Sequence, residues 1–152
     1  MKEDMIYIGS DHRGYKIKEA IKEYLDKTQL DYIDCGTDTE DRTDYPDFAK
    51  KVAENVQKDI NNRGILICGT GIGMCIVANK FKGIRCALCY NKETAKYARL
   101  HNNSNILALC ANDNTVEENL EIFKAWISTN FEGDRHQKRL NIIQKIESEN
   151  FK

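Results

Sequence analysis

Residues 64–73 read GILICGTGIG, an unbroken apolar run followed by a turn rich in glycine. A short, continuous apolar run is typical of a strand that is buried on both faces of a sheet. The glycines permit a tight connection into a following helix and a close approach of a ligand to the backbone. The stretch therefore predicts a buried strand that leads directly into a helix, which is a unit of a parallel sheet.

The same pattern recurs on both sides of this stretch. The predicted strands are Met5–Gly9, Leu30–Cys35, Ile65–Cys68, Ile84–Tyr90 and Ile106–Cys110. Helical spacing separates them, with Pro46 in a first turn, Asn91 as a cap and a capping box from Thr115 to Glu118. The alternation predicts a single α/β domain over residues 1–152: a three-layer αβα sandwich with a Rossmann- or flavodoxin-like five-stranded parallel sheet.

The last amphipathic segment, which carries Leu140, Ile143 and Ile146, has no strand before it. We therefore expect an extra C-terminal helix without a place on its own sheet, free to pack against a partner subunit.

Composition excludes several classes of protein. The 152 residues are 41% hydrophobic and 31% charged, with 23 Lys and Arg against 24 Asp and Glu. A net charge of -1 gives no general attraction to nucleic acid or to an acidic membrane. The longest apolar run, Ile65–Ala78, falls short of the ~20 residues that span a bilayer. The N-terminus has no signal-peptide pattern, so we expect a cytoplasmic protein.

Six cysteines are numerous for this length, and a reducing compartment keeps their thiols free. Cys86 and Cys89 form a C-x-x-C motif within a predicted strand, where residues three apart point to opposite faces. One metal ion cannot easily bind both, so we predict no metal site and buried packing for most of the cysteines.

In a parallel sheet of this kind, ligands bind beyond the carboxyl ends of the strands. Ser10–Gly14 follow the first strand, Arg42–Pro46 follow the second, and Gly69–Gly73 follow the third. The helix after the fourth strand ends at His101 and Asn102.

The loop after Cys68 is suited to an anion, because its backbone N–H groups meet the positive end of a helix. It is not a Walker A loop, and Met74 stands where a dinucleotide fingerprint needs glycine. A helix N-terminus lowers a thiol pKa, so Cys68 is a candidate base or nucleophile. The alternatives are a tight turn without a ligand and a core cysteine.

Three further groups are candidates, each with a simpler alternative. Asp11 and His12 can share a proton or bind a hydroxyl, or they can be a helix cap and a solvated imidazole. His101 and its neighbouring amide can contact a sugar, or they can cap a helix end. Arg135 and Arg139, four residues apart, can clamp a phosphate or form a solvated basic face.

Taken together in order, these segments resemble the type B ribose-5-phosphate isomerases, the family that also includes galactose-6-phosphate isomerase subunits. The resemblance covers nearly the whole chain. Its markers are Gly9–His12, Arg42–Pro46, Gly64–Gly73, Ala78–Lys80, His101–Asn102 and Glu132–Arg139.

The resemblance implies a chemistry and assigns roles in it. The family interconverts an aldose phosphate and a ketose phosphate through a cis-enediolate, with neither cofactor nor metal. Cys68 would move the proton between C2 and C1, and His101 would open the sugar ring. The enediolate oxygens would be held by Thr70 and by backbone N–H groups of the loop, at Gly69, Gly71, Ile72 and Gly73.

The remaining assignments concern binding. Ser10, Asp11 and Asn102 would contact the sugar, His12 and Tyr45 would line the site, and Arg135 and Arg139 would bind the phosphate. Family members form at least dimers, so the resemblance implies a homodimer or a dimer of dimers with sites shared between subunits.

Within the family, Cys68 and the segment from Gly133 to Arg139 favour ribose-5-phosphate over galactose-type substrates. There is one departure: Asn112 stands where the family usually has a phosphate-binding arginine, and Cys110 replaces a residue that is often small. This predicts weaker substrate binding, a different phosphate pose or a substitute contact nearby.

Three other interpretations stay open. The first is an isomerase of a six-carbon aldose phosphate such as allose- or galactose-6-phosphate. The second is a non-catalytic module that binds a sugar phosphate or a nucleotide. The third, which the motifs favour least, is a thiol-based redox or metal protein.

Overall fold

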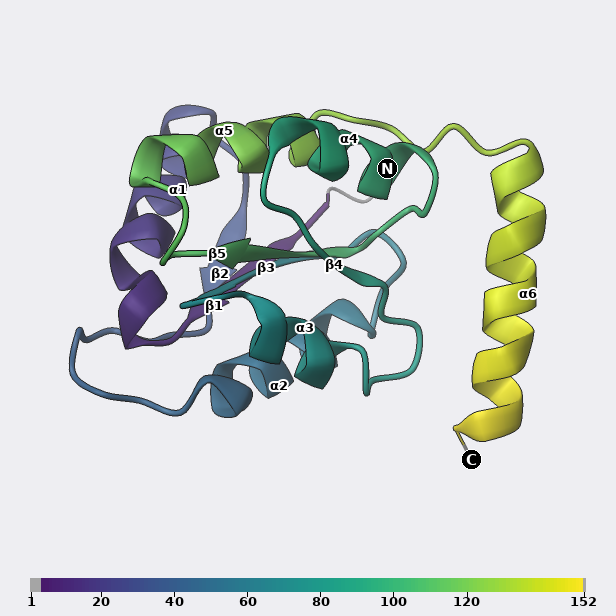
Figure 1. Cartoon of the computed structure of the whole chain (residues 1–152), viewed down its shortest axis with the longest axis horizontal. Coiled ribbons are helices and arrows are strands. Elements are labelled where there is room, and N and C mark those ends of the chain that lie inside the picture. Colours follow the sequence, from purple (N-terminus) through teal and green to yellow (C-terminus); the bar gives the residue numbers. More distant parts are fainter. Residues whose placement is uncertain (1–3, 152) are drawn as a thin grey trace.

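Five parallel strands form one sheet in the order β2-β1-β3-β5-β4 in a computed structural model, which describes residues 4–151 (Figure 1). The strands are β1 Ile6–Ser10, β2 Tyr32–Asp34, β3 Arg63–Cys68, β4 Cys86–Leu88 and β5 Ile106–Cys110. This confirms the predicted α/β class and the parallel sheet. The order differs from the flavodoxin-like 2-1-3-4-5 in one respect, because β5 lies between β3 and β4.

Burial explains that exchange. Every residue of β5 is buried, whereas every residue of β4 is only partly buried. The fully buried strand therefore occupies an interior position with two neighbours, and the less buried one lies at the edge. The two edge strands, β2 and β4, are also shorter than the predicted runs Leu30–Cys35 and Ile84–Tyr90, since an edge strand pairs on one side only.

Helices cover both faces of the sheet, as predicted (Figure 1). They are the 3-10 turn η1 His12–Gly14 and the helices α1 Tyr15–Lys27, α2 Tyr45–Val56, α3 Ile72–Ala78, α4 Lys92–Leu100, α5 Val116–Ile127 and α6 Arg135–Asn150. One core forms where α1, α4 and α5 pack on the sheet, and a second forms beneath α2 and α3. The sheet is thus the middle layer of three.

The predicted helix signals are confirmed at their positions. Pro46 lies in the first turn of α2, and the Asn91 side chain accepts a hydrogen bond from the Thr94 N–H at the start of α4. Thr115 and Glu118 form a reciprocal capping box at the start of α5. Each device satisfies backbone N–H groups that a helix leaves unpaired in its first turn.

The C-terminal helix α6 stands to one side of the sandwich, beyond β4 (Figure 1). His136 and Leu140 are buried, but Ile142, Ile143 and Ile146 are each about half exposed. The predicted extra helix is therefore present, with an apolar face that its own chain leaves open. Its packing against a partner subunit stays a prediction.

Within residues 4–151, none of the helices combines the length and the apolar character that crossing a membrane requires.

Candidate active site

The chain leaves β1 toward β2 on one side and places β3 on the other, so the sheet has a topological switch point between β1 and β3. Crevices at such a point, beyond the carboxyl ends of the strands, bind ligands. Ser10 pairs with Ile67, and the Asp11 N–H donates to the Ile67 carbonyl at 3.2 Å. This register brings the segment after β1 beside Cys68, the last residue of β3.

Two glycines shape the loop after Cys68. Gly71 has φ +77°, and a Cβ there would overlap the Leu88 side chain. A Cβ on Gly73 would overlap the ring of Tyr45, the first residue of α2. Glycine at these positions lets the loop turn tightly into α3 and lets the exposed tyrosine lie directly against it.

The sulfur of Cys68 faces this loop. Its Sγ accepts a hydrogen bond from the Gly71 N–H at 3.2 Å, and the residue is 5% exposed. Burial raises the pKa of the Cys68 thiol, and the N–H groups of Met74 and Gly71 only partly offset that effect. The expectation that the helix end would lower this pKa was therefore wrong for the net shift, because desolvation of the thiolate outweighs the helix N–H groups.

Thr70 is exposed at the tip of the loop. Its Oγ1 accepts from the Ile72 N–H at 3.2 Å, and its carbonyl accepts from the Tyr90 hydroxyl at 3.2 Å. Because the hydroxyl acts here as an acceptor, its own proton is free to be donated outward. The loop therefore presents a hydroxyl donor beside backbone N–H groups.

Asp11 and His12 are both held by backbone contacts. The Asp11 carboxylate accepts from the N–H groups of Arg13 and Gly14 and caps η1, so its simpler interpretation as a cap is confirmed. His12 Nδ1 accepts from the Thr43 N–H at 3.2 Å, and the His12 N–H donates to Thr43 Oγ1 at 3.1 Å. Since Nδ1 accepts, the neutral ring carries its proton on Nε2.

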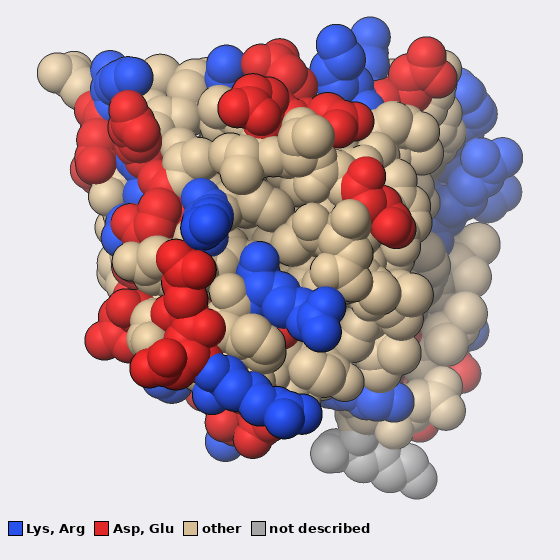
Figure 2. All heavy atoms as spheres, turned by 60° about the vertical axis from the view of Figure 1, so that its left-hand side comes forward, with Lys and Arg blue, Asp and Glu red and all other residues tan. Residues whose placement is uncertain are grey.

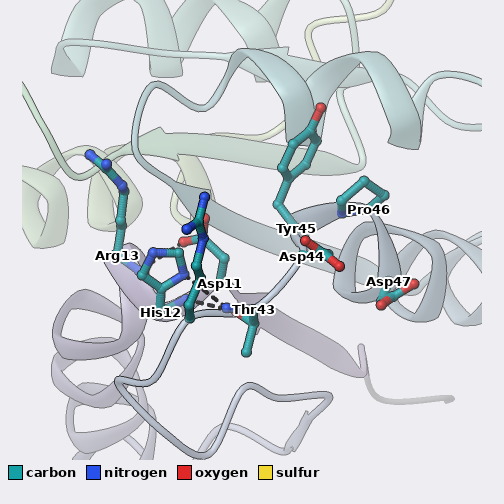
Figure 3. Close-up of a pocket in the computed structure, with 9 residues that line it drawn as sticks. Asp11, His12, Arg13, Thr43, Asp44, Tyr45, Pro46 and Asp47 are labelled. Carbon is teal, nitrogen blue, oxygen red and sulfur yellow. Dashed lines mark hydrogen bonds between the residues drawn. The ribbon is translucent and has the colours of Figure 1, made fainter.

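These residues line an open pocket of about 860 Å³ (Figure 3). Figure 3 shows His12 and Thr43 joined by their hydrogen bonds, with Tyr45 on the far side of Thr43 from Arg13 in this view. The lining residues are Asp11, His12, Arg13, Arg42, Thr43, Asp44, Tyr45, Pro46 and Asp47. Ser10 is not among the lining residues: it is fully buried, and its hydroxyl has no partner among residues 4–151, so its predicted sugar contact stays a prediction.

The other predicted residues lie at the opposite end of the parallel strands, near the start of β5. His101 and Asn102 follow α4, which starts beyond the carboxyl end of β4 and runs back toward the start of β5. The Asn102 carbonyl accepts from Arg85, the residue before β4. The five residues of β5 therefore separate this group from Cys68 by about 13 Å, at ordinary strand geometry.

At that end His101 is part of a compact cluster. Its ring stacks on His136, with centroids 4.2 Å apart and planes 14° apart, and its Nε2 lies 3.9 Å from a Glu132 carboxylate oxygen. His136 is buried, and its Nε2 has no partner in the described part of the chain. Burial, Arg135 and His101 lower the pKa of His136.

This cluster is also the place where a cation could bind. Donor atoms of His101, Glu132 and His136 lie within 4.8 Å of one another. The exposed Arg135 and Arg139 begin α6 next to it, and an Arg135 Nη1 lies 3.5 Å from Glu132.

The predicted site residues thus fall into two separate groups within one chain, which we call half-sites. The first half-site lies at the carboxyl ends of the strands and consists of Cys68, Thr70, the loop glycines, Asp11, His12 and Tyr45. The second half-site lies at the opposite end of the strands and consists of His101, Asn102, Arg135 and Arg139. Sequence reasoning gave no role to Arg13 in the first half-site or to Glu132 in the second. Both residues lie inside the segments that the sequence pattern marked as functional. Their position next to assigned residues was the signal that could have identified them.

Comparison with known proteins covers this same span. Residues 6–143 match the family model described as Ribose/Galactose Isomerase. Ribose-5-phosphate isomerase B of Escherichia coli is 42% identical over 142 residues, which are 93% of this chain and 95% of that protein.

Solved structures are similar over nearly the whole chain. The crystal structure of ribose-5-phosphate isomerase B from Mycoplasma genitalium with bound ribulose-5-phosphate has a TM-score of 0.95 and 42% identity, and the match covers 99% of this chain and 100% of that one. Ribose-5-phosphate isomerase B of Clostridium thermocellum has a TM-score of 0.92 and 45% identity, with 95% and 98% covered.

Proposed function

The chain belongs to the ribose/galactose isomerase family, and from that premise we propose that it interconverts ribose-5-phosphate and ribulose-5-phosphate without a cofactor. The observation that carries the proposal is the position of the Cys68 sulfur at the mouth of a loop of backbone N–H groups, 3.2 Å from the nearest of them. Such a loop can stabilise the negative charge that develops when a sugar carbon loses a proton.

The proton transfer assigns a role to each part of the first half-site. The Cys68 thiolate takes the proton from C2 of the open-chain aldose, and the electron pair of the broken C–H bond forms the C1–C2 double bond of an enediolate. The Thr70 hydroxyl and the loop N–H groups hold the enediolate oxygens. As the C1–C2 double bond forms, the π electrons of the C1 carbonyl move onto O1. The same thiol then returns the proton to C1 while the O2 hydroxyl proton passes to O1, so that C2 becomes the carbonyl of the ketose and no net electrons are lost or gained.

The raised pKa of Cys68 suits this role. Burial keeps the resting thiol protonated, so only a minor fraction is thiolate near neutral pH. A thiolate of higher pKa is also a stronger base toward a weakly acidic C–H bond.

The second half-site belongs to a partner subunit in this proposal. His101 opens the furanose ring, Asn102 contacts the sugar, and Arg135 and Arg139 bind the phosphate, but β5 separates them from Cys68 of the same chain. A second copy that places its own half-site over the pocket removes the separation. The open apolar face of α6 supports an assembly of this kind, a homodimer or a dimer of dimers.

The pentose is the substrate that we favour. A protein 42% identical to this chain binds ribulose-5-phosphate, and the match spans 99% of the chain. A six-carbon aldose phosphate is the competing substrate, and kcat/KM for ribose-5-phosphate against allose- and galactose-6-phosphate decides between them. Higher values for a hexose phosphate would refute the pentose assignment.

The purified protein should convert ribose-5-phosphate to ribulose-5-phosphate in the presence of EDTA, because no step uses a metal ion. Cys68→Ala should lower kcat by at least about a hundredfold, as expected when a general base is removed. Cys35→Ala, which removes a partly buried thiol after β2, with β1 between that strand and β3, is the matched control and should keep wild-type activity. Ligand-induced thermal stabilisation without turnover would instead indicate a binding module.

A further inference from the structure

The exposed side chain of Arg13 is a cation without an assigned role at the carboxyl ends of the strands. It is the middle residue of η1, directly after β1 and His12. Gly14, the next residue, packs so closely on β3 that a Cβ there would lie 2.6 Å from Ile67. The backbone that carries Arg13 is therefore fixed against the strand that ends at Cys68.

The side chain of Arg13 extends over the loop that follows Cys68. Its Nη1 donates to Asn112 Oδ1 at 3.3 Å. An added Cβ on Gly69 would lie 3.1 Å from Arg13 Cδ and 3.0 Å from Asn112 Nδ2. Figure 3 shows the side chain reaching away from the His12–Thr43 pair. Arg13 and Asn112 therefore meet directly above the first residue of the loop.

Most of the N–H donors of the Arg13 guanidinium have no hydrogen-bond partner among residues 4–151. Among residues 4–151, Arg13 forms no ion pair with a carboxylate, and Asn112 is the only hydrogen-bond partner of its side chain. The nearby Asp11 carboxylate is occupied by the backbone N–H groups of η1. An arginine carries five N–H donors in a planar fork, so most of them remain available to a ligand.

The contact with Asn112 also orients that amide. Because Oδ1 accepts from Arg13, the Nδ2 group is left as a donor on the same side of Gly69. The pair thus offers a charged fork and an amide N–H₂ to one ligand, which matches the oxygens of a phosphate group. Figure 2, which brings the left-hand side of Figure 1 forward, shows Lys and Arg side chains in the middle of that face, between a group of Asp and Glu side chains and a wide uncharged area.

We propose that Arg13 binds the phosphate of the substrate from this subunit, and that it supplies at the end of β1 the positive charge that Asn112 does not supply at the end of β5. The proposal rests on the proposed function, because it takes the ligand to be a sugar phosphate whose C1 and C2 lie at Cys68. Its phosphate, three carbons and one ester oxygen further on, then lies over the mouth of the loop within reach of Arg13. Arg135 and Arg139 approach the same group from the partner.

The first test removes the charge. Arg13→Ala should raise KM for ribose-5-phosphate and the competitive inhibition constant of inorganic phosphate together, by about 10- to 100-fold, the usual effect of losing a charged hydrogen bond. The value of kcat should change much less, because Arg13 does not touch the reacting carbons. Lys16→Ala, which removes an exposed cation three residues further along in α1, should change neither constant.

The second test moves the charge. In the double variant Arg13→Ala with Asn112→Arg, a guanidinium from β5 enters the space that Arg13 occupied, and most of the lost affinity should return. A purely structural role of Arg13 would instead lower the melting temperature, and relocation of the charge would not restore binding.

Two results would overturn the proposal: unchanged KM and phosphate inhibition in Arg13→Ala, or no recovery of affinity in a folded double variant. Calorimetric titration with inorganic phosphate gives a readout that needs no turnover. If the wild type binds phosphate but converts no sugar, the proposed function fails while the effect of Arg13 is still measured. If it turns over sugar and Arg13→Ala binds phosphate normally, only the role of Arg13 fails.

Discussion

Cys68 is subject to two opposing local effects. The N–H groups of the loop favour its thiolate, whereas burial under the same loop disfavours it, and burial prevails. The stabilisation of the thiolate by N–H groups was predictable from the sequence, because a cysteine before a glycine-rich turn into a helix can be recognised there. The effect of burial was not, because it depends on how closely the surrounding chain packs around the sulfur.

The pH dependence of catalysis follows from this balance. The Cys68 pKa lies above its ordinary value of 9.0, so the thiolate fraction of the free enzyme is small at pH 7 and grows with pH. We predict that kcat/KM of the wild type keeps rising through pH 9. A profile that levels off below pH 8 would show that the base is not this thiol, or that its pKa is not raised.

Among the secondary-structure elements, helix α1 is attached to the edge strand β2 by two ion pairs. Lys18 is fully buried and lies 2.7 Å from Asp34 at the end of β2, and Lys22 lies 2.8 Å from the same carboxylate. Burial acts to raise the pKa of Asp34, but the two ammonium groups outweigh it and the net pKa is lowered. These two contacts hold β2 in place, and the loop that ends at Tyr45 follows β2 directly.

Asp34→Asn should therefore destabilise the protein by about 1–3 kcal/mol at pH 7, because it removes one of the two carboxylates that pair with the buried Lys18 and leaves only Glu19, at 3.0 Å. A lowered carboxyl pKa contributes stability above the unfolded-state value of 3.8, and that contribution is lost as the pH falls through the lower folded-state value. The difference from wild type should thus shrink in acid as the pH falls below 3.8.

Urea unfolding at fixed protein concentration measures this difference. Lys27→Ala, which removes an exposed ion pair with Glu23, is the control and should change the free energy of unfolding by less than about 1 kcal/mol. Equal effects of the two variants would contradict the account of Asp34.

Much of the element pattern was predictable from local chemistry. The strand Ile106–Cys110 has the predicted bounds, and the caps at Asn91 and Thr115 lie where their side chains indicated. The order of the last two strands was not predictable, because it depends on the relative burial of whole strands. The bounds of the edge strands were too wide because an apolar run does not show how many neighbours a strand will have.

At the scale of the whole molecule, the two half-sites lie at opposite ends of the parallel strands, because Cys68 ends β3 whereas His101 lies between the end of α4 and the start of β5. Sequence analysis identified residues of both, yet it could not show that α4 carries His101 away from the end of the strands where Cys68 lies. That separation makes the association of subunits part of the catalytic account. In the proposed assembly, the half-exposed isoleucines of α6 would be covered by the partner, which would remove apolar surface from water.

The central claim is that an intact site combines Cys68 of one subunit with His101 of another. The most direct test is co-expression of Cys68→Ala and His101→Ala chains with different affinity tags, followed by purification of the mixed assembly and the isomerase assay. Each parent variant should be nearly inactive on ribose-5-phosphate. In a symmetric dimer the mixed assembly contains one intact site of two, so it should recover about half of wild-type kcat. A mixed assembly as inactive as its parents would contradict the claim.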